Sequence, residues 1–210
     1  MDEDTKIVVR RTTSESKIEV AVSLGDRDPD CKKKIDTSLQ FFNHMLETIC
    51  WRACMNIAVR VELEDFRLTH VICEDVGLAL GEAYLELFER ELELGINGTG
   101  AAISCIDEAL AQAAVSFEGR ALLVMDEKLT TGPELVEDMQ RADLAAFFEG
   151  FAQGARATLH LDLLRGSNPH HVWESVFRAF GAALRTSFSR CEWRGGTTPG
   201  VKGKVVLEKE

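Results

Sequence analysis

One segment of the 210-residue chain occurs twice, and this repeat limits the possible folds more than any other feature of the sequence. Six residues recur at an offset of 100 positions: His70, Glu74, Val76, Ala79, Gly81 and Ala83 match His170, Glu174, Val176, Ala179, Gly181 and Ala183. Paired phenylalanines precede each copy, at 41–42 and at 147–148. Matching side chains at one common offset indicate an internal duplication rather than two unrelated amphipathic helices.

The hydrophobic pattern predicts the same order of elements in each copy: strands, helix, strand, helix. Apolar and polar residues alternate, as in strands with one solvated face, at 18–22, 57–63, 121–124 and 157–161. Helical periodicity fits 39–53, 75–91, 144–154 and 172–187. We therefore predict an α+β fold of two duplicated β-α halves, 1–94 and 95–210. Their sheets pack against helices about a pseudo-twofold axis, and together they form one compact domain.

Charge and hydropathy exclude several classes of protein. A formal net charge of -11 and a pI near 5.0 argue against a nucleic-acid-binding protein, which needs a basic face. Residues 1–4 are acidic and lack the basic-then-apolar order of a signal peptide. No apolar run approaches the roughly 18 residues that span a bilayer. We therefore expect a cytoplasmic protein with no nucleic-acid or membrane partner.

The six cysteines form no C-x-x-C pair. In a cytoplasmic chain they are expected to be free thiols that pack as small apolar side chains, and not a disulfide framework. Cys50 and Cys54, four residues apart on a predicted helix, can touch.

The five histidines are the strongest candidates for a functional site: His44, His70, His160, His170 and His171. Residues four apart share one face of a helix, so His70 can bind a metal together with Glu74, and His170 with Glu174. His171 is turned about 100° from His170 and points elsewhere. Imidazole and carboxylate ligands suit a divalent transition metal such as Mn, Fe or Zn. A single pair of this kind is more often a surface hydrogen bond, but its duplication favours a metal site.

Other catalytic motifs are missing from the sequence. There is no H-E-x-x-H zinc protease motif, because no glutamate lies between two histidines four apart. There is also no G-x-S-x-G motif, so a triad hydrolase is poorly supported.

Several segments, in one order from residue 11 to residue 207, resemble the imidazoleglycerol-phosphate dehydratase family. They are Arg11–Ser16, Phe41–Leu46, Glu74–Ala83, Ile106–Leu110, Gly119-Arg120, Thr158–His160, Gly166–Glu174, Phe177–Phe180 and Lys202-Gly203. The resemblance implies a ribosomal protein S5 domain 2-like fold and a large cage-like homo-oligomer. It also implies dehydration of imidazoleglycerol phosphate to imidazoleacetol phosphate in histidine biosynthesis. The implied cofactor is a divalent metal, Mn²⁺, with two ions per site and ligands from neighbouring subunits.

The resemblance also implies roles for individual residues. One metal would take His44, His70, Glu74 and His171, and the other would take His160, His170 and Glu174. Glu15 matches the family's acidic residue for proton transfer, so its role would be general acid and base. The phosphate contacts would be Arg120, Arg178 and Lys202.

The sequence departs from the family at some of these sites. Val71 replaces the second of two adjacent histidines, Asn97 replaces an arginine, and the serine before the late Lys-Gly is replaced around Gly200. Arg52 and Asn43 replace a histidine and an aspartate. Two interpretations remain open. The chain performs the family reaction, or it is a paralogue with altered substrate or lost catalysis that acts as a metal-dependent oligomeric scaffold or binding protein.

Overall fold

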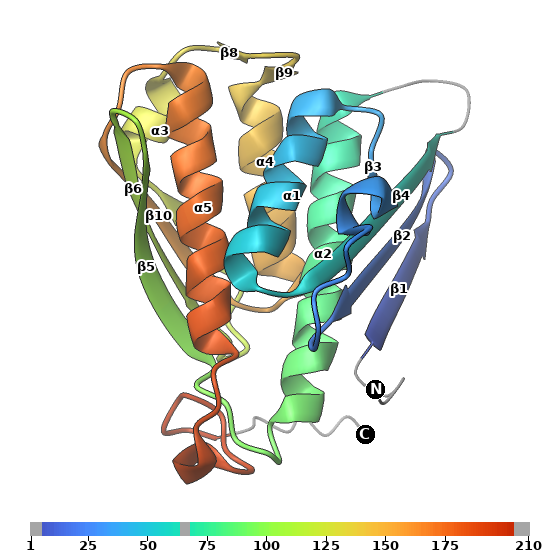
Figure 1. The fold of residues 1–210 in the computed structure, drawn as a ribbon, viewed down its shortest axis with the longest axis vertical. Helices are drawn as coiled ribbons and strands as arrows, with labels where there is room; N and C mark the ends of the chain where they lie inside the picture. Colours follow the sequence, from blue (N-terminus) through green and yellow to red (C-terminus); the bar gives the residue numbers. More distant parts are fainter. Residues whose placement is uncertain (1–5, 64–67, 204–210) are drawn as a thin grey trace, which may run out of the picture.

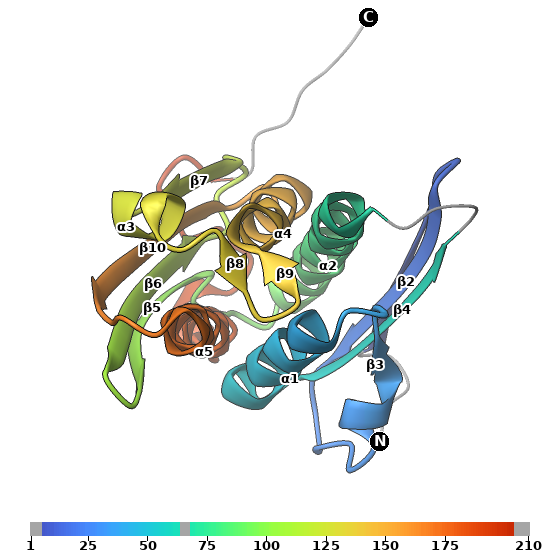
Figure 2. The same ribbon diagram turned by 90° about the horizontal axis from the view of Figure 1, so that it is seen from above.

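Two four-stranded sheets form the outer layers of the molecule, and four long helices lie between them (Figure 1, Figure 2). The computed structural model describes residues 6–63 and 68–203. The first half contains β1 (Lys6–Thr12), β2 (Ser16–Ser23), η2 (Cys31–Lys34), β3 (Ile35–Asp36), α1 (Gln40–Ala53), β4 (Asn56–Leu63) and α2 (Thr69–Glu91). The second contains β5 (Thr99–Ile106), β6 (Ala109–Ser116), β7 (Leu122–Met125), α3 (Glu127–Thr131), β8 (Leu135–Val136), β9 (Met139–Gln140), α4 (Arg141–Gly154), β10 (Thr158–Arg165), α5 (Pro169–Ser187) and η3 (Glu192–Arg194).

The two sheets have the same topology. Their strand orders are β1-β2-β4-β3 and β5-β6-β10-β7. In each sheet the last pair is parallel and the other neighbours are antiparallel. The predicted α+β fold of duplicated halves, with sheets packed against helices, is therefore confirmed. The predicted boundary between residues 94 and 95 lies in the loop between α2 and β5. We propose that the two halves divide there.

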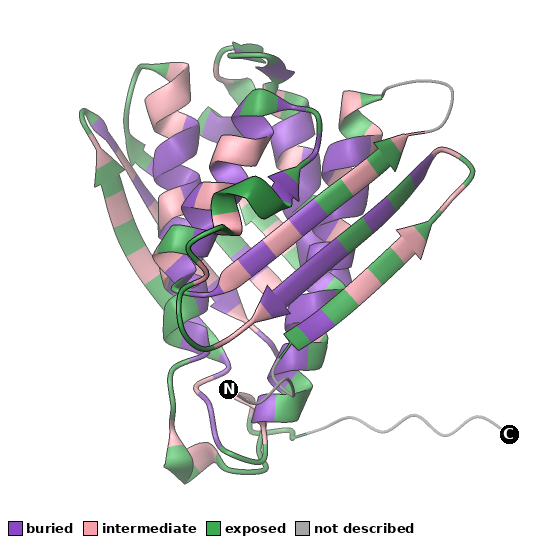
Figure 3. Cartoon of the chain, turned by 45° about the vertical axis from the view of Figure 1, so that its right-hand side comes forward, coloured by how far each residue is buried: buried purple, intermediate pink, exposed green. Residues whose placement is uncertain are grey.

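Aromatic side chains fill the space between the layers. The paired phenylalanines of the two halves meet near the centre, where the rings of Phe42 and Phe147 lie 5.3 Å apart edge to face. Phe147 also stacks on Phe177 at 5.5 Å. Along the strands, buried and exposed residues alternate, so each sheet has one face in the core (Figure 3). The repeated sequence thus supplies the core from both sides.

Two of the predicted helices begin earlier than the periodicity indicated. α2 begins at Thr69 and α5 at Pro169. Asn168 caps α5, because its side-chain oxygen accepts hydrogen bonds from the backbone amides of His170 (2.9 Å) and His171 (3.4 Å). Proline at the first helical position favours the same start. The consequence is that every histidine and glutamate of the repeated segment is helical. None of the helices in the described ranges is long and apolar enough to cross a membrane.

Helices α2 and α4 cross at glycine positions. A methyl group on Gly77 would overlap the carbonyl oxygen of Phe147, and one on Gly150 would overlap the carbonyl oxygen of Glu74. Gly81 and Gly154 make the same kind of backbone approach one turn further along their helices. Only glycine allows helix backbones to pack this closely.

We expect Gly77→Ala to lower the free energy of unfolding by about 1–3 kcal/mol, because overpacking at this crossing outweighs the better helix propensity of alanine. Urea unfolding monitored by circular dichroism measures the change. Gly195→Ala is the control, because a methyl group there would lie 3.4 Å from its nearest atoms. Equal stability of the two variants would contradict the tight crossing.

Candidate metal centre

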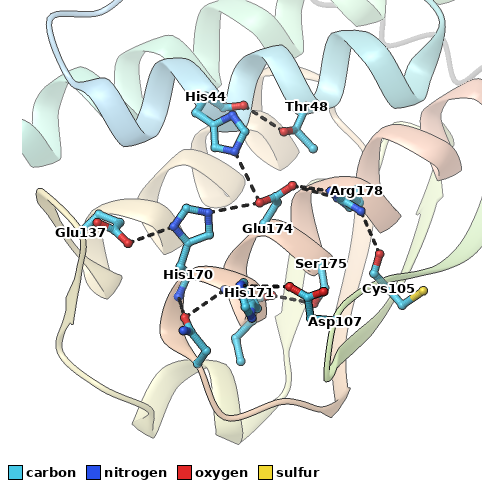
Figure 4. Close-up of polar contacts among 12 residues, drawn as sticks. His44, Thr48, Cys105, Asp107, Glu137, His170, His171, Glu174, Ser175 and Arg178 are labelled. Carbon is cyan, nitrogen blue, oxygen red and sulfur yellow. Dashed lines mark hydrogen bonds and ion pairs between the residues drawn. The ribbon is translucent and has the colours of Figure 1, made fainter.

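The four long helices all begin at the same end of the molecule (Figure 1). His44 lies in the second turn of α1, and His170 lies in the first turn of α5, followed by Glu174 one turn later. The ligand atoms of these three residues all lie within 4.8 Å of one another. Glu174 Oε2 is 3.4 Å from His44 Nε2 and 3.2 Å from His170 Nε2, and the side chains converge from the two helices (Figure 4).

Glu174 is held as a carboxylate by Arg178. Its side chain is 6% exposed, and Oε1 accepts hydrogen bonds from Arg178 Nε at 2.9 Å and Nη2 at 2.7 Å. Burial alone raises the pKa of Glu174, but the hydrogen bonds and charge of Arg178, and then His44, outweigh it and lower the pKa. Glu174 is therefore ionised at neutral pH. One of its oxygens is occupied by the guanidinium, and the other faces the two imidazoles.

The adjacent histidines His170 and His171 are each oriented by a carboxylate of their own. His170 Nδ1 lies 2.9 Å from Glu137 Oε1, and His171 Nδ1 lies 2.8 Å from Glu108 Oε2. Backbone hydrogen bonding from Asn168, and then the contact with His171, lower the pKa of Glu108 to about 2. The hydrogen bond to Glu108 raises the pKa of His171. Glu137 binds Nδ1 of His170 and leaves its Nε2 facing Glu174, as in carboxylate–histidine–metal arrangements, whereas Nε2 of His171 lies 3.4 Å from Asp107 Oδ2.

The sequence did not reveal these two carboxylates as site residues. Glu108 lies in one of the family-like segments, which is the signal that would have found it. Glu137 lies in the turn between β8 and β9, with a left-handed φ of 54°. Nothing in the local sequence connects this turn to His170.

The turn between β8 and β9 also holds helix α1. The carboxylate of Asp138 accepts hydrogen bonds from the backbone amides of Gln40 at 3.0 Å and Phe41 at 3.1 Å. Leu39, the residue at the cap position, gives no side-chain hydrogen bond of its own. Asp138 therefore caps α1 from a distant part of the chain. Adjacent residues of one turn thus contact both helices that carry the candidate ligands.

We expect Glu137→Gln to weaken metal binding by about 10–100-fold, because the amide orients His170 less well than the carboxylate does. Competition with a fluorescent chelator measures the affinity. Glu134→Gln, on the same segment, is the control. Unchanged affinity in the Glu137 variant would show that the contact does not support the ligand.

The other predicted ligands lie apart from this cluster within one chain. His70 Nε2 is 3.9 Å from Glu74 Oε2, and His70 Nδ1 is 3.8 Å from Asp143 of α4. His171 faces Glu108 and Asp107. His160 lies on β10 and is exposed on the outer face of its sheet. A single chain thus brings His44 to His170 and Glu174, a different set from either predicted one.

Glu15 lies in the turn between β1 and β2, beside the first turns of α2. The neighbouring Ser16 donates a hydrogen bond to Asp75 of α2 at 3.1 Å, and Arg11 contacts the same carboxylate at 2.9 Å. The backbone amide of Glu15 donates to Thr13 Oγ1 at 3.1 Å. Glu15 is therefore near the helix that carries His70 and Glu74.

Arg120 and Lys202, two of the three predicted phosphate contacts, lie at the opposite end of the molecule from His44, His170 and Glu174. Arg120 pairs with Glu118 and directly precedes β7, which runs parallel to β10 and begins beside its first residue. Helix α5, which carries His170 and Glu174, begins after the last residue of β10, at the other end of that strand. A methyl group on Gly200 would lie 2.9 Å from Glu118, so the segment that carries Lys202 lies at this end too. Arg178, in contrast, is part of the cluster.

A hollow of about 300 Å³ opens beside the cluster between α1 and α5. Its lining includes His44, Glu174 and Arg178, together with Arg52 and Trp51 from the following turns of α1. Arg52, where the family has histidine, thus adds a positive charge to the wall. Asn97, at the position of the family's arginine, instead donates a hydrogen bond to the carbonyl oxygen of Thr186 at 3.0 Å.

Comparisons with known proteins match one family over most of the chain. The family model described as imidazoleglycerol-phosphate dehydratase matches residues 37–184. The chain is 34% identical over 195 residues to the imidazoleglycerol-phosphate dehydratase of Methylococcus capsulatus, covering 93% of this chain and 95% of that protein. It is 37% identical over 205 residues to the enzyme of the same name from Azoarcus, covering 94% and 97%.

Solved structures give the same result. The crystal structure of IGPD from Pyrococcus furiosus superposes with a TM-score of 0.76 at 29% identity, covering 93% of this chain and 99% of that one. The imidazoleglycerol-phosphate dehydratase from Staphylococcus aureus superposes with a TM-score of 0.73 at 26% identity, covering 88% and 100%. Because the family model and these relatives span most of the chain, it is a hydro-lyase that belongs to the imidazoleglycerol-phosphate dehydratase family.

Proposed function

We propose that this chain is a cytoplasmic, metal-dependent enzyme that removes water from imidazoleglycerol phosphate to give imidazoleacetol phosphate in histidine biosynthesis. The observation that carries the proposal is the convergence of His44, His170 and Glu174 beside an open hollow. All three residues match ligand positions of the family, although His44 was predicted for one metal and His170 and Glu174 for the other.

The donor groups fit a divalent transition metal. Two imidazole nitrogens and one carboxylate oxygen face one another, and Arg178 leaves that oxygen free. Imidazole and carboxylate donors suit Mn²⁺, which we propose as the ion. We also propose that His70, Glu74, His160 and His171 act as ligands. A bound divalent ion would supply Lewis-acid chemistry, which lowers the barrier for removing a hydrogen that is not acidic by itself.

The chain's own residues have distinct roles in this proposal. Glu137 and Glu108 orient the imidazoles, and Arg178 keeps Glu174 ionised. Glu15 transfers protons as general acid and base on the glycerol chain. Arg120, Arg178 and Lys202 bind the phosphate.

We further propose that the complete site forms between copies of the chain in a large homo-oligomer. The support is that, within one copy of the chain, Arg120 and Lys202 lie at the opposite end of the molecule from His170, so a single copy does not bring them together. In addition, the outer face of the second sheet exposes apolar side chains around His160. Ile103 is 60% exposed, Leu122 54% and Val124 40%. An apolar face of this kind is typical of a surface that another protein covers.

Turnover of imidazoleglycerol phosphate by the purified protein saturated with Mn²⁺ tests the function. Product formation at a rate that depends on enzyme concentration supports the proposal. A folded, metal-loaded protein without turnover would contradict it and favour the scaffold or binding protein. The observation that favours this second candidate is Val71, which stands where the family has a histidine ligand.

Complete removal of metal with a chelator is expected to dissociate the assembly, because ligands from different copies would no longer be joined. Light scattering before and after chelation measures the mass. Restoring Mn²⁺ is the control and should restore the mass. An unchanged mass after demetallation would mean that no metal bridges the subunits.

A further inference from the structure

A second, larger cavity lies next to the hollow of the candidate metal centre and shares Glu47 and Trp51 of α1 with it. It measures about 750 Å³ and is formed by the loop after β2, by η2 and by the end of α1. Cys31 of η2 and Cys50 of α1 line it, with their sulfur atoms 2.7 Å apart. This separation is close to the roughly 2.05 Å of a disulfide bond, so the two thiols need to move little to become bonded.

The two thiols differ in their access to solvent. Cys50 is 7% exposed, whereas Cys31 is half-buried at the start of η2. Burial, and then the hydrogen bond with Cys31, raise the pKa of Cys50 to about 12. Cys50 therefore stays protonated near neutral pH, and Cys31 is the thiol that meets a reagent first.

Cys54 directly follows the last residue of α1, and its sulfur lies at the edge of the cavity next to other partners. Its sulfur is 3.9 Å from Arg185 Nη1 of α5 and 3.8 Å from the carbonyl oxygen of Trp51. The spacing of Cys50 and Cys54 allows a contact between them, and the structure places Cys50 against Cys31. A third thiol at the edge of the same cavity provides an internal control.

We propose that Cys31 and Cys50 form a reversible disulfide by exchange with a small-molecule disulfide that enters the cavity. The Cys31 thiolate attacks one sulfur of the reagent, which leaves a mixed disulfide and releases one small thiol. Cys50 then loses its proton to solvent and attacks the Cys31 sulfur, and the second small thiol leaves. Two protein thiols are oxidised, and one small-molecule disulfide is reduced to two thiols.

The bond would join η2 to α1 and close the loop from residue 31 to residue 50. Closing a loop of this length restricts the unfolded chain. We therefore expect the oxidised protein to melt roughly 5–10 °C higher than the reduced protein, with full reversal by dithiothreitol. Since α1 carries His44, the redox state of the pair would set how firmly that helix is held.

The test is peptide mapping after incubation of the full-length protein with oxidised glutathione. Trypsin cuts after Arg27, Lys32, Lys34 and Arg52, so Cys31 lies in peptide 28–32, Cys50 in 35–52 and Cys54 in 53–60. The expected product is peptide 28–32 joined to 35–52, two hydrogens lighter than the sum of the free peptides. Free thiols or separate glutathione adducts on the two peptides would overturn the proposal.

Two variants separate the pair from the third thiol. Cys31→Ser is expected to abolish both the linked peptide and the rise in melting temperature, whereas Cys54→Ser is expected to keep both. A crosslink between Cys50 and Cys54, or an equal rise in melting temperature in Cys31→Ser, would assign the effect to other thiols. Neither readout requires turnover, so the result is independent of the proposed reaction.

Discussion

Glu174→Gln is expected to lower turnover by at least about 100-fold and to reduce the amount of bound metal. Glu174 uses Oε1 for Arg178 and turns Oε2 toward His44 and His170. A glutamine amide is neutral and has only one acceptor atom. It cannot accept from Arg178 and offer an oxygen to a metal at the same time. The loss should exceed the roughly 10–100-fold effect of removing an orienting partner, because a direct ligand is changed.

Metal content by elemental analysis and turnover should both be measured for this variant. Glu149→Gln is the matched control, because Glu149 is an exposed carboxylate on the neighbouring helix α4. The control should keep the full metal content and rate. Normal metal content and normal turnover in Glu174→Gln would show that the cluster in one chain is not the metal site.

Glu15→Gln is expected to reduce turnover by about two to four orders of magnitude while leaving the metal content unchanged. This range is the usual contribution of a general acid or base. The hydrogen bond to Thr13 is donated by the backbone amide of Glu15, so the substitution leaves it intact. The fold and the neighbouring Asp75 contacts should therefore persist.

Steady-state kinetics together with metal analysis distinguishes Glu15→Gln, which should keep its metal, from Glu174→Gln, which should lose it. Glu19→Gln, on the strand that follows, removes an exposed carboxylate that pairs with Arg10 and is the control. A normal rate in Glu15→Gln would transfer the proton-transfer role to another residue. Loss of metal in the same variant would instead indicate that Glu15 supports the ligands.

Elements with a long, regular hydrophobic pattern could be predicted from the sequence. The repeated helices and strands β2, β4, β7 and β10 belong to this group, whereas β1, β5 and β6 were not predicted. The early starts of α2 and α5 were missed, because the first turn of a helix is fixed by caps such as Asn168 and not by periodicity. The short elements α3, β8 and β9 are too brief to show a period at all.

The histidines of the site could be predicted as candidates, but their grouping within one chain could not. His44 and Glu174 are 130 positions apart, and only the crossing of α1 and α5 brings them together. The role of Glu137 depends on a two-residue turn that contacts His170 on a helix later in the chain. Local sequence patterns contain no information on such contacts, which arise from tertiary packing.

The two helix crossings have diverged since the duplication. At the crossing of α2 and α4, Gly150 touches the backbone of Glu74 and leaves no room for a side chain. The paired phenylalanines place His44 of α1 where α4 has Gly150, and Glu174 corresponds to Glu74. At one crossing the helix backbones pack against each other through glycines, while at its counterpart the side chains of His44 and Glu174 face each other. A change on the wall of the hollow, such as Arg52 on α1, therefore alters the chemistry at one crossing while the glycine contacts of the other remain.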